Sequence, residues 1–238
     1  MPPLTLPAVL TPALLSSIRA QPRLPNHTWY FIASVTLSVI NRPDEIPKVF
    51  NYALEHGVDP LDNAKPSHDE QLKVARKLRE GLVKSAAVIG LPKVCIWLAG
   101  SLLVKKQLPL EAGEHKLMTL PQNYQTINAL FALKTATPLD LQDEPMSLSP
   151  SARTIELYDQ PSSEILMRGQ RFFDKVYGKV SKRVMGQMDR SGTEDLGLTA
   201  RLMYGYLLSN TSILTPMESS FVLLAGLIRK HFPFYDQC

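Results

Sequence analysis

The 238-residue chain has few of the residues on which many reaction centres depend. Its two cysteines, Cys95 and Cys238, form neither a CxxC pair nor a zinc-binding spacing. No basic segment followed by an apolar one opens the chain, so a secretory signal peptide is not expected. Strand-like alternation is rare and apolar residues recur at helical spacing, so we expect a mainly α-helical protein.

Charge of one sign is also scarce, because the net charge is +4 and basic residues are interspersed with acidic ones. Lys73, Arg76 and Lys77, for example, lie between Glu70 and Glu80. Aromatic residues do not alternate with these bases, so we expect no nucleic-acid partner. The sequence predicts neither a metal site nor a cofactor. We expect an intracellular protein, and the residues leave cytoplasm, mitochondrion and peroxisome open.

Capping patterns predict where several helices begin. Ser67 with Glu70, and Thr215 with Glu218, each have the spacing of a capping box. The first opens a helix with an apolar stripe, and the second opens the helix 216–228. Three further signals are Thr11 before Pro12 as an N-cap, Asp44 as the N-cap of the next helix, and Gly57 as its end.

Residues 139–163 are rich in proline and serine, and this composition predicts a linker. It would separate an N-terminal helical part, residues 11–138, from a C-terminal part, residues 164–238.

Two segments carry a family resemblance. The segment FFDKVYGKVSKRVMGQMDRSGTEDLGLTARLMYGYLLSNTSILTPMESSFVLLAGLI (172–228) resembles the fungal carboxymuconolactone decarboxylase-like proteins of the AhpD-like superfamily. The segment NRPDEIPKVFNYALEHG (41–57) is similar to the first half of that family. The resemblance covers roughly 11–93 and 126–228. It implies an all-α, AhpD-like helical fold of two related halves, with the second half truncated, and members are commonly homo-oligomers.

The resemblance also implies where catalytic residues should lie. The peroxidase branch of the superfamily uses a CxxC pair with Glu and His, and the decarboxylase branch uses acid–base residues such as His. This chain has no CxxC, His231 lies outside the family pattern, and Ser220 aligns better than Glu218 with the family glutamate. The chain then has peroxidase-type oxidoreductase or lyase ancestry with a degenerate active site, and whether it is an enzyme stays open. The alternative is a non-catalytic helical protein for oligomerisation or small-ligand binding.

Three residues are the candidates for a remaining site: Glu218, Arg201 and Tyr204. Arg201 could bind a substrate carboxylate bidentately at the lip of a small-molecule pocket. The other interpretation of its surroundings is a set of caps and a turn at Gly192. The other interpretation of Glu218 is the capping box alone.

Residues 94–125, which include Cys95, are predicted to be an insert. Joining Lys93 to Thr126 gives GLPKTINALFALKTATP, which is similar to an uninterrupted family motif. Our hypothesis is that 94–125 and 229–238 derive from translated introns. A membrane span over 86–104 is disfavoured because Pro92 and Lys93 lie in its middle, and Cys95 has no partner for thiol catalysis. With its cover missing, the apolar helix 216–228 is expected to make the chain oligomerise or aggregate.

Overall fold

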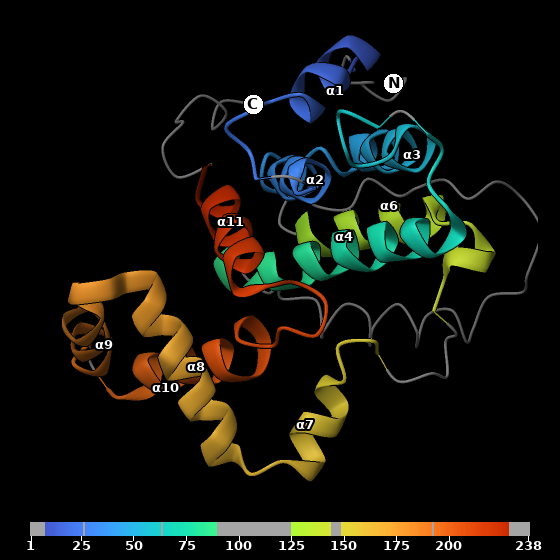
Figure 1. Ribbon diagram of the computed structural model, residues 1–238. Helices are drawn as coiled ribbons and strands as arrows, with labels where there is room; N and C mark the ends of the chain where they lie inside the picture. The colour runs from blue at the N-terminus through green and yellow to red at the C-terminus, as the bar shows by residue number, and fades with distance from the viewer. Residues whose placement is uncertain are drawn as a thin grey trace, which may run out of the picture.

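The computed structural model describes residues 8–25, 27–62, 64–89, 125–143, 149–191 and 193–228. Within these ranges every regular element is a helix (Figure 1), which confirms the all-α prediction. The α-helices are α1 (Pro12–Arg19), α2 (Trp29–Val39), α3 (Ile46–His56), α4 (His68–Ile89), α6 (Gln125–Ala136), α7 (Arg153–Asp159), α8 (Ser162–Tyr177), α9 (Ser181–Asp189), α10 (Asp195–Leu202) and α11 (Pro216–Leu227). The 3₁₀ turns are η1 (Pro43–Glu45), η2 (Leu139–Leu141) and η3 (Gly178–Val180), and η4 (Met203–Leu208) is a π-helical continuation of α10.

The main core lies around α2, in a first lobe formed by α1–α4, α6 and α11 (Figure 1). Helix α2 is apolar nearly all round, and such a helix is stable only when it is enclosed. Its Trp29, Phe31 and Val35 are buried. Helix α4 contributes Leu78 and Leu82 to the same core, and it packs against α2, α6 and α11.

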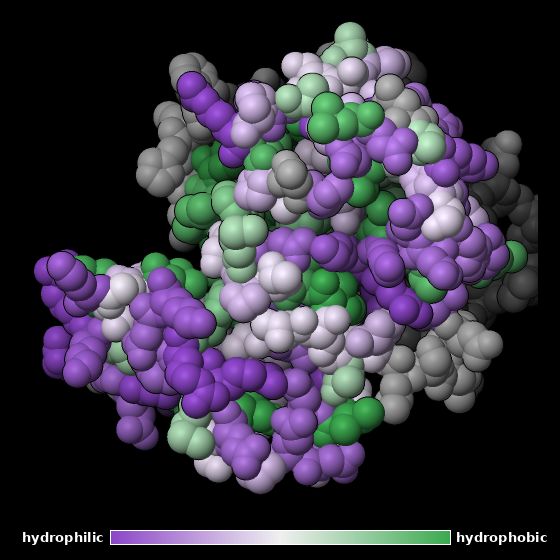
Figure 2. All heavy atoms as spheres, in the orientation of Figure 1, coloured by the Kyte–Doolittle hydropathy of each residue, from purple (hydrophilic) through white to green (hydrophobic). Residues whose placement is uncertain are grey.

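Helices α7–α10 with η3 and η4 form a second lobe, below the first in Figure 1. Its apolar cluster has three buried members, Phe172, Leu208 and Leu223, and the last belongs to α11 of the first lobe. On the left of Figure 2 the outline of the molecule is indented between the end of this lobe and the first lobe. The second lobe therefore depends on the first for part of its core.

Several capping predictions are confirmed. The Thr11 hydroxyl accepts from the Leu14 N–H at 3.2 Å, and Gly57 ends α3 with a φ of 70°. Both predicted capping boxes form, one between Ser67 and Glu70 and the other between Thr215 and Glu218.

One expectation is wrong, and another stays a prediction. Asp44 does not cap α3, because it lies in η1 and its carboxylate pairs with Arg42 at 3.0 Å. The helix begins later, at Ile46, without a side-chain cap. The Pro- and Ser-rich stretch 139–163 contains η2 and α7. Two residues of α7, Arg153 and Glu156, bind η4 and α8, and the division into two parts at this stretch stays a prediction.

Helix α11 is only half enclosed. Val222 and Ala225 are buried against the first lobe, whereas Met217, Leu224, Leu227 and Ile228 are exposed. Part of the expected apolar exposure is therefore present.

Other predictions concern residues outside the described ranges. Cys95 and almost all of the predicted insert lie there, as do His231 and Cys238. Most of the segment 86–104 lies there too. None of the described helices is long and apolar enough to cross a membrane.

The contact between α8 and η4 yields a test. A Cβ on Gly169 would lie 2.5 Å from the Gly205 N and 2.6 Å from its Cα, so a larger residue must separate two backbones. We expect Gly169→Ala to lower the free energy of unfolding by about 1–3 kcal/mol in chemical denaturation.

Gly186→Ala is the matched control. A Cβ there meets only the end of the Arg190 side chain, at 3.2 Å. Because alanine favours helix over glycine, this variant should be neutral or up to about 1 kcal/mol more stable. Equal effects of the two substitutions would contradict the backbone contact.

Candidate functional site

The polar centre of the molecule is the carboxyl end of η4. The last carbonyl groups of a helix have no helical donor, and the helix dipole makes this end negative. Here cations from three different helices reach them. Arg168 of α8 donates to the Gly205 O at 3.2 Å. Arg153 of α7 donates to the Tyr206 O at 3.3 Å and to the Leu207 O at 3.2 Å. Lys84 of α4 donates to the Leu208 O at 3.1 Å. We call these side chains, with Glu80, Glu156 and Asn210, the η4 network.

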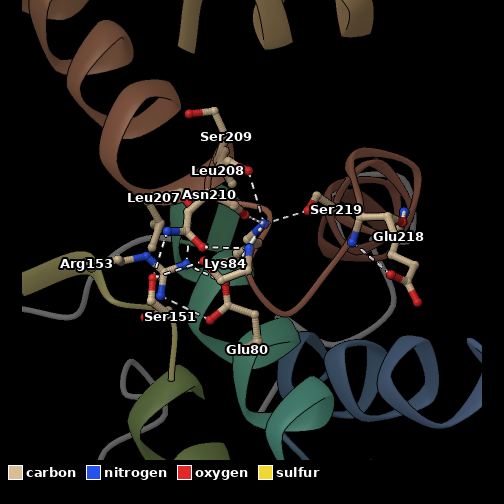
Figure 3. Close-up of polar contacts among 12 residues, drawn as sticks. Glu80, Lys84, Ser151, Arg153, Leu207, Leu208, Ser209, Asn210, Glu218 and Ser219 are labelled. Atoms are coloured by element: carbon tan, nitrogen blue, oxygen red, sulfur yellow. Dashed lines mark hydrogen bonds and ion pairs between the residues drawn. The ribbon is translucent and has the colours of Figure 1, made fainter. Parts of the chain in front are cut away.

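Lys84 is the most enclosed charge of the network, with 0% of its surface exposed. Besides the Leu208 O, its Nζ donates to the Asn210 O and to the Ser219 Oγ, each at 2.6 Å (Figure 3). Burial lowers the pKa of Lys84 to about 8, although the nearby Glu80 carboxylate opposes this shift. An ammonium group has three N–H donors, and all three are used. Lys84 therefore joins α4 to the end of η4 and to α11.

The two buried carboxylates of the network each face an arginine. Glu80 and Arg153 form two hydrogen bonds, one of them 3.0 Å long. Glu156 accepts two bonds of 2.8 Å from Arg168, and these lower the pKa of Glu156. Asn210 completes the arrangement by donating to Glu156 at 3.0 Å. Buried charges are tolerated when they are paired and hydrogen-bonded in this way.

Glu218 lies beside this network but belongs to a cap. Its carboxylate accepts from the Thr215 N–H at 2.8 Å and from the Lys77 Nζ at 2.6 Å. Burial by itself would raise the pKa of Glu218, but the bonds from Lys77 and Thr215 outweigh it and hold the pKa below its ordinary value. Ser220 binds its own helix through the Pro216 O. At neutral pH Glu218 is thus an ionised, doubly engaged carboxylate.

Arg201 lies in the second lobe, where its guanidinium binds both carboxylate oxygens of Asp189 at 2.6 and 2.7 Å. The two residues, with Glu194 and Leu198, line a hollow of about 490 Å³. Gly197 makes room for the pair, because a Cβ there would lie 1.8 Å from the Asp189 Oδ1. Asp189 therefore occupies the position at which a substrate carboxylate was expected. Ligand binding at Arg201 stays a prediction that requires displacement of Asp189.

Tyr204 lies in an aromatic cluster. Its ring centroid is 4.9 Å from that of Phe173 in an edge-on arrangement, and its hydroxyl donates to the Tyr177 hydroxyl at 3.4 Å. Burial raises the pKa of Tyr204 above its ordinary value. No hydrogen bond or ion pair between described residues joins Tyr204 or Arg201 to Glu218. The three candidates thus belong to three separate local arrangements.

Sequence reasoning missed the η4 network. One signal was available in α4. Lys84 is the single charged residue between Glu80 and the end of this helix at Ile89, in a run that is otherwise apolar or small. The roles of Arg153 and Arg168 carried no comparable signal. Within the described ranges, no group of three His, Cys, Asp or Glu residues could hold a metal ion.

The chain is similar to two fungal proteins named Peroxisomal protein 2. It is 28% identical over 204 residues to the one from Schizosaccharomyces pombe, covering 86% of this chain and 70% of that protein. It is 28% identical over 232 residues to the one from Saccharomyces cerevisiae, covering 90% of this chain and 79% of that protein. No protein-family model and no solved structure matches the chain. Because the similarity spans most of the chain, it extends over both lobes.

Removal of the Lys84 ammonium tests the network. In Lys84→Met, the Leu208 O, the Asn210 O and the Ser219 Oγ lose their common donor within the core. We expect the free energy of unfolding at pH 7 to fall by about 2–4 kcal/mol in chemical denaturation. Lys73→Met, on the exposed side of the same helix, should change it by less than about 0.5 kcal/mol. Equal stability of the two variants would contradict the anchoring role.

The pH dependence gives a second measurement. The pKa of Lys84 is about 8 in the folded chain and 10.5 in the reference state, so between these values the unfolded chain binds more protons. The contribution of Lys84 to the free energy of unfolding should therefore rise with pH in this window, by about 3 kcal/mol in total. The difference between native protein and Lys84→Met, measured from pH 7 to 10.5, should show this rise. A constant difference would place the pKa of Lys84 near its ordinary value.

Proposed function

We propose that this chain is a helical protein of the peroxisome that works by self-association, through a second copy docked on the exposed face of α11. The observation that carries the proposal is an apolar stripe on that face, formed by Met217, Leu224, Leu227 and Ile228. Their exposed fractions are 60%, 61%, 37% and 40%. We call these four residues the α11 stripe.

The spacing of the α11 stripe suits a helix partner. Leu224 follows Met217 by seven residues, and Leu227 and Ile228 follow by three and four more. Residues at these intervals lie on one face of a helix, as in the seam between paired helices. The opposite face is already used, since Val222 packs in the first lobe. An unoccupied seam on a helix with one buried face supports an external partner.

The charges on α11 support a second copy as that partner. Glu218 is the sole charged residue of α11, and it is tied to Lys77. The α11 stripe thus has no charge that would repel an identical stripe or select a partner of opposite sign. A two-fold dimer brings the same patch from both copies together, and an uncharged stripe permits this.

The energetics favour a reversible dimer. Full burial of such a side chain contributes about 1.5–3 kcal/mol, and roughly half of each stripe residue is exposed. Four residues then contribute about 3–6 kcal/mol from each copy, from which the cost of immobilising two molecules must be subtracted. We therefore expect a concentration-dependent equilibrium.

The compartment and the ancestry are the finer parts of the proposal. The names of the two fungal relatives support a peroxisomal location. The resemblance of 172–228 to carboxymuconolactone decarboxylase-like proteins, which are commonly oligomers, supports an AhpD-like fold. Self-association requires no peroxidase or lyase activity. The three candidate side chains, Glu218, Arg201 and Tyr204, each have a hydrogen-bond partner within the chain.

A charge placed in the α11 stripe tests self-association. The native protein should sediment with a mass that rises with concentration between about 1 and 100 µM, the range of a weak specific complex. Leu224→Glu should remain a monomer across this range, because a buried unpaired carboxylate opposes docking.

Leu61→Glu is the matched control, because Leu61 is 94% exposed and lies outside α11. This variant should associate like the native protein. A native protein that is monomeric at every concentration, or a control that dissociates equally, would overturn the proposed function.

A further inference from the structure

The net charge of the protein is concentrated at one end of the second lobe. Residues 170–191 contain six basic residues and two acidic ones, a net of +4, which equals the net charge of the whole chain. The basic residues are Arg171, Lys175, Lys179, Lys182, Arg183 and Arg190, and all are exposed. The residues outside 170–191 have a net charge of zero. We call this set the basic end.

The fold turns these cations outward. Helix α8 ends at Gly178, whose φ of 53° lies in the left-handed region that glycine adopts without strain. The chain then reverses through η3 into α9, which lies at the left extremity of the molecule (Figure 1). Helix α9 packs inward through Met185 and presents Lys182 and Arg183 to solvent. The reversal brings the end of α8 and the outer side of α9 into one protruding region.

The cations of the basic end are not used inside the protein. Among the described residues, no side-chain hydrogen bond or ion pair engages Arg171, Lys175, Lys179, Lys182 or Arg183. The two acids are partly occupied, because Asp189 binds Arg201 and Asp174 accepts from the Gln170 amide. The positive charge therefore remains available to an external anion.

Apolar side chains lie among these cations. Val176, Tyr177 and Val180 are exposed, between Lys175 on one side and Lys182 on the other. Figure 2 shows hydrophobic patches along the upper edge of this otherwise hydrophilic end of the lobe. Basic residues with interspersed apolar ones are typical of segments that lie at the interface of an anionic bilayer, where the cations meet headgroups and the apolar groups enter the acyl boundary.

We propose that the basic end docks on anionic lipid headgroups at a membrane surface. Two features favour a lipid surface over nucleic acid. The cations lie on a protruding end, which suits a flat surface, and two of the three interspersed residues are valines, which offer no face for base stacking. Docking through the basic end is peripheral and needs no membrane-spanning helix. It is also independent of the α11 stripe.

The test is co-sedimentation of the full chain with vesicles. Vesicles of phosphatidylcholine with about one third phosphatidylserine should bind the protein, and pure phosphatidylcholine vesicles should not. Raising the salt from 50 to 500 mM should weaken binding, since screening acts on exposed charges. Each cation near the membrane raises the partition coefficient roughly fivefold. A triple variant should therefore lower this coefficient on the order of 100-fold; it combines Lys179→Gln, Lys182→Gln and Arg183→Gln.

The matched control removes three exposed lysines from the first lobe, as Lys65→Gln, Lys73→Gln and Lys134→Gln combined. It changes the net charge equally and should bind vesicles within about threefold of the native protein, as expected for charges far from the surface. Val180→Ser should weaken binding at high salt, where the apolar contact remains. Thermal unfolding of both triple variants checks that the fold is kept.

Three results would overturn the proposal. The first is equal binding to neutral and anionic vesicles. The second is an equal loss in both triple variants, which would indicate a response to overall charge. The third is a duplex oligonucleotide that displaces the protein from vesicles at equimolar phosphate, which would assign the basic end to nucleic acid.

Discussion

Four carbonyl groups at the end of η4 lack helical partners, and the placement of the second lobe depends on the three cations that reach them. Lys84, Arg153 and Arg168 come from α4, α7 and α8, so one helix end fixes the relative positions of three other helices. The apolar cluster of the second lobe is small, and the η4 network therefore carries an unusual share of its organisation. Each cation also has a carboxylate or hydroxyl partner, so its charge is paired or hydrogen-bonded within the protein.

This use of polar groups bears on function. A reaction centre needs a donor, acceptor or nucleophile that is free to meet a substrate, whereas the N–H groups of Lys84 are all engaged by the protein. The lowered pKa of Lys84 reflects its burial. Structural networks of buried charges shift pKa values as active sites do, so this shift does not by itself indicate catalysis. Among the described residues, the α11 stripe and the basic end are two sets of side chains that face solvent. These two surfaces belong to different lobes, α11 to the first and the end of α8 with α9 to the second.

Parts of the architecture could be predicted from residue patterns because the forces that decide them are local. The Thr215 and Glu218 capping box needs four consecutive residues, and the structure forms it as expected. The helical class followed from the spacing of apolar residues. The failure at Asp44 has a local cause as well, because Arg42, two residues away, offered its carboxylate a stronger partner than a helix N-terminus.

The candidate site could not be predicted to the same extent. The capping box, which is the second interpretation of Glu218, needs only neighbouring residues, and the structure forms it. The partner of Arg201 is Asp189, twelve residues away across a turn, and no local pattern indicates this pair. The Lys84 and Ser219 contact joins residues 135 positions apart, and no pattern along the chain encodes such a distance. The sequence by itself determined the helical class, where α1, α4 and α11 begin and where α3 ends, and which residue types are scarce. Tertiary structure alone decided which charges are neutralised inside and which remain outside, because pairing depends on how separate helices pack and on the exclusion of water that follows.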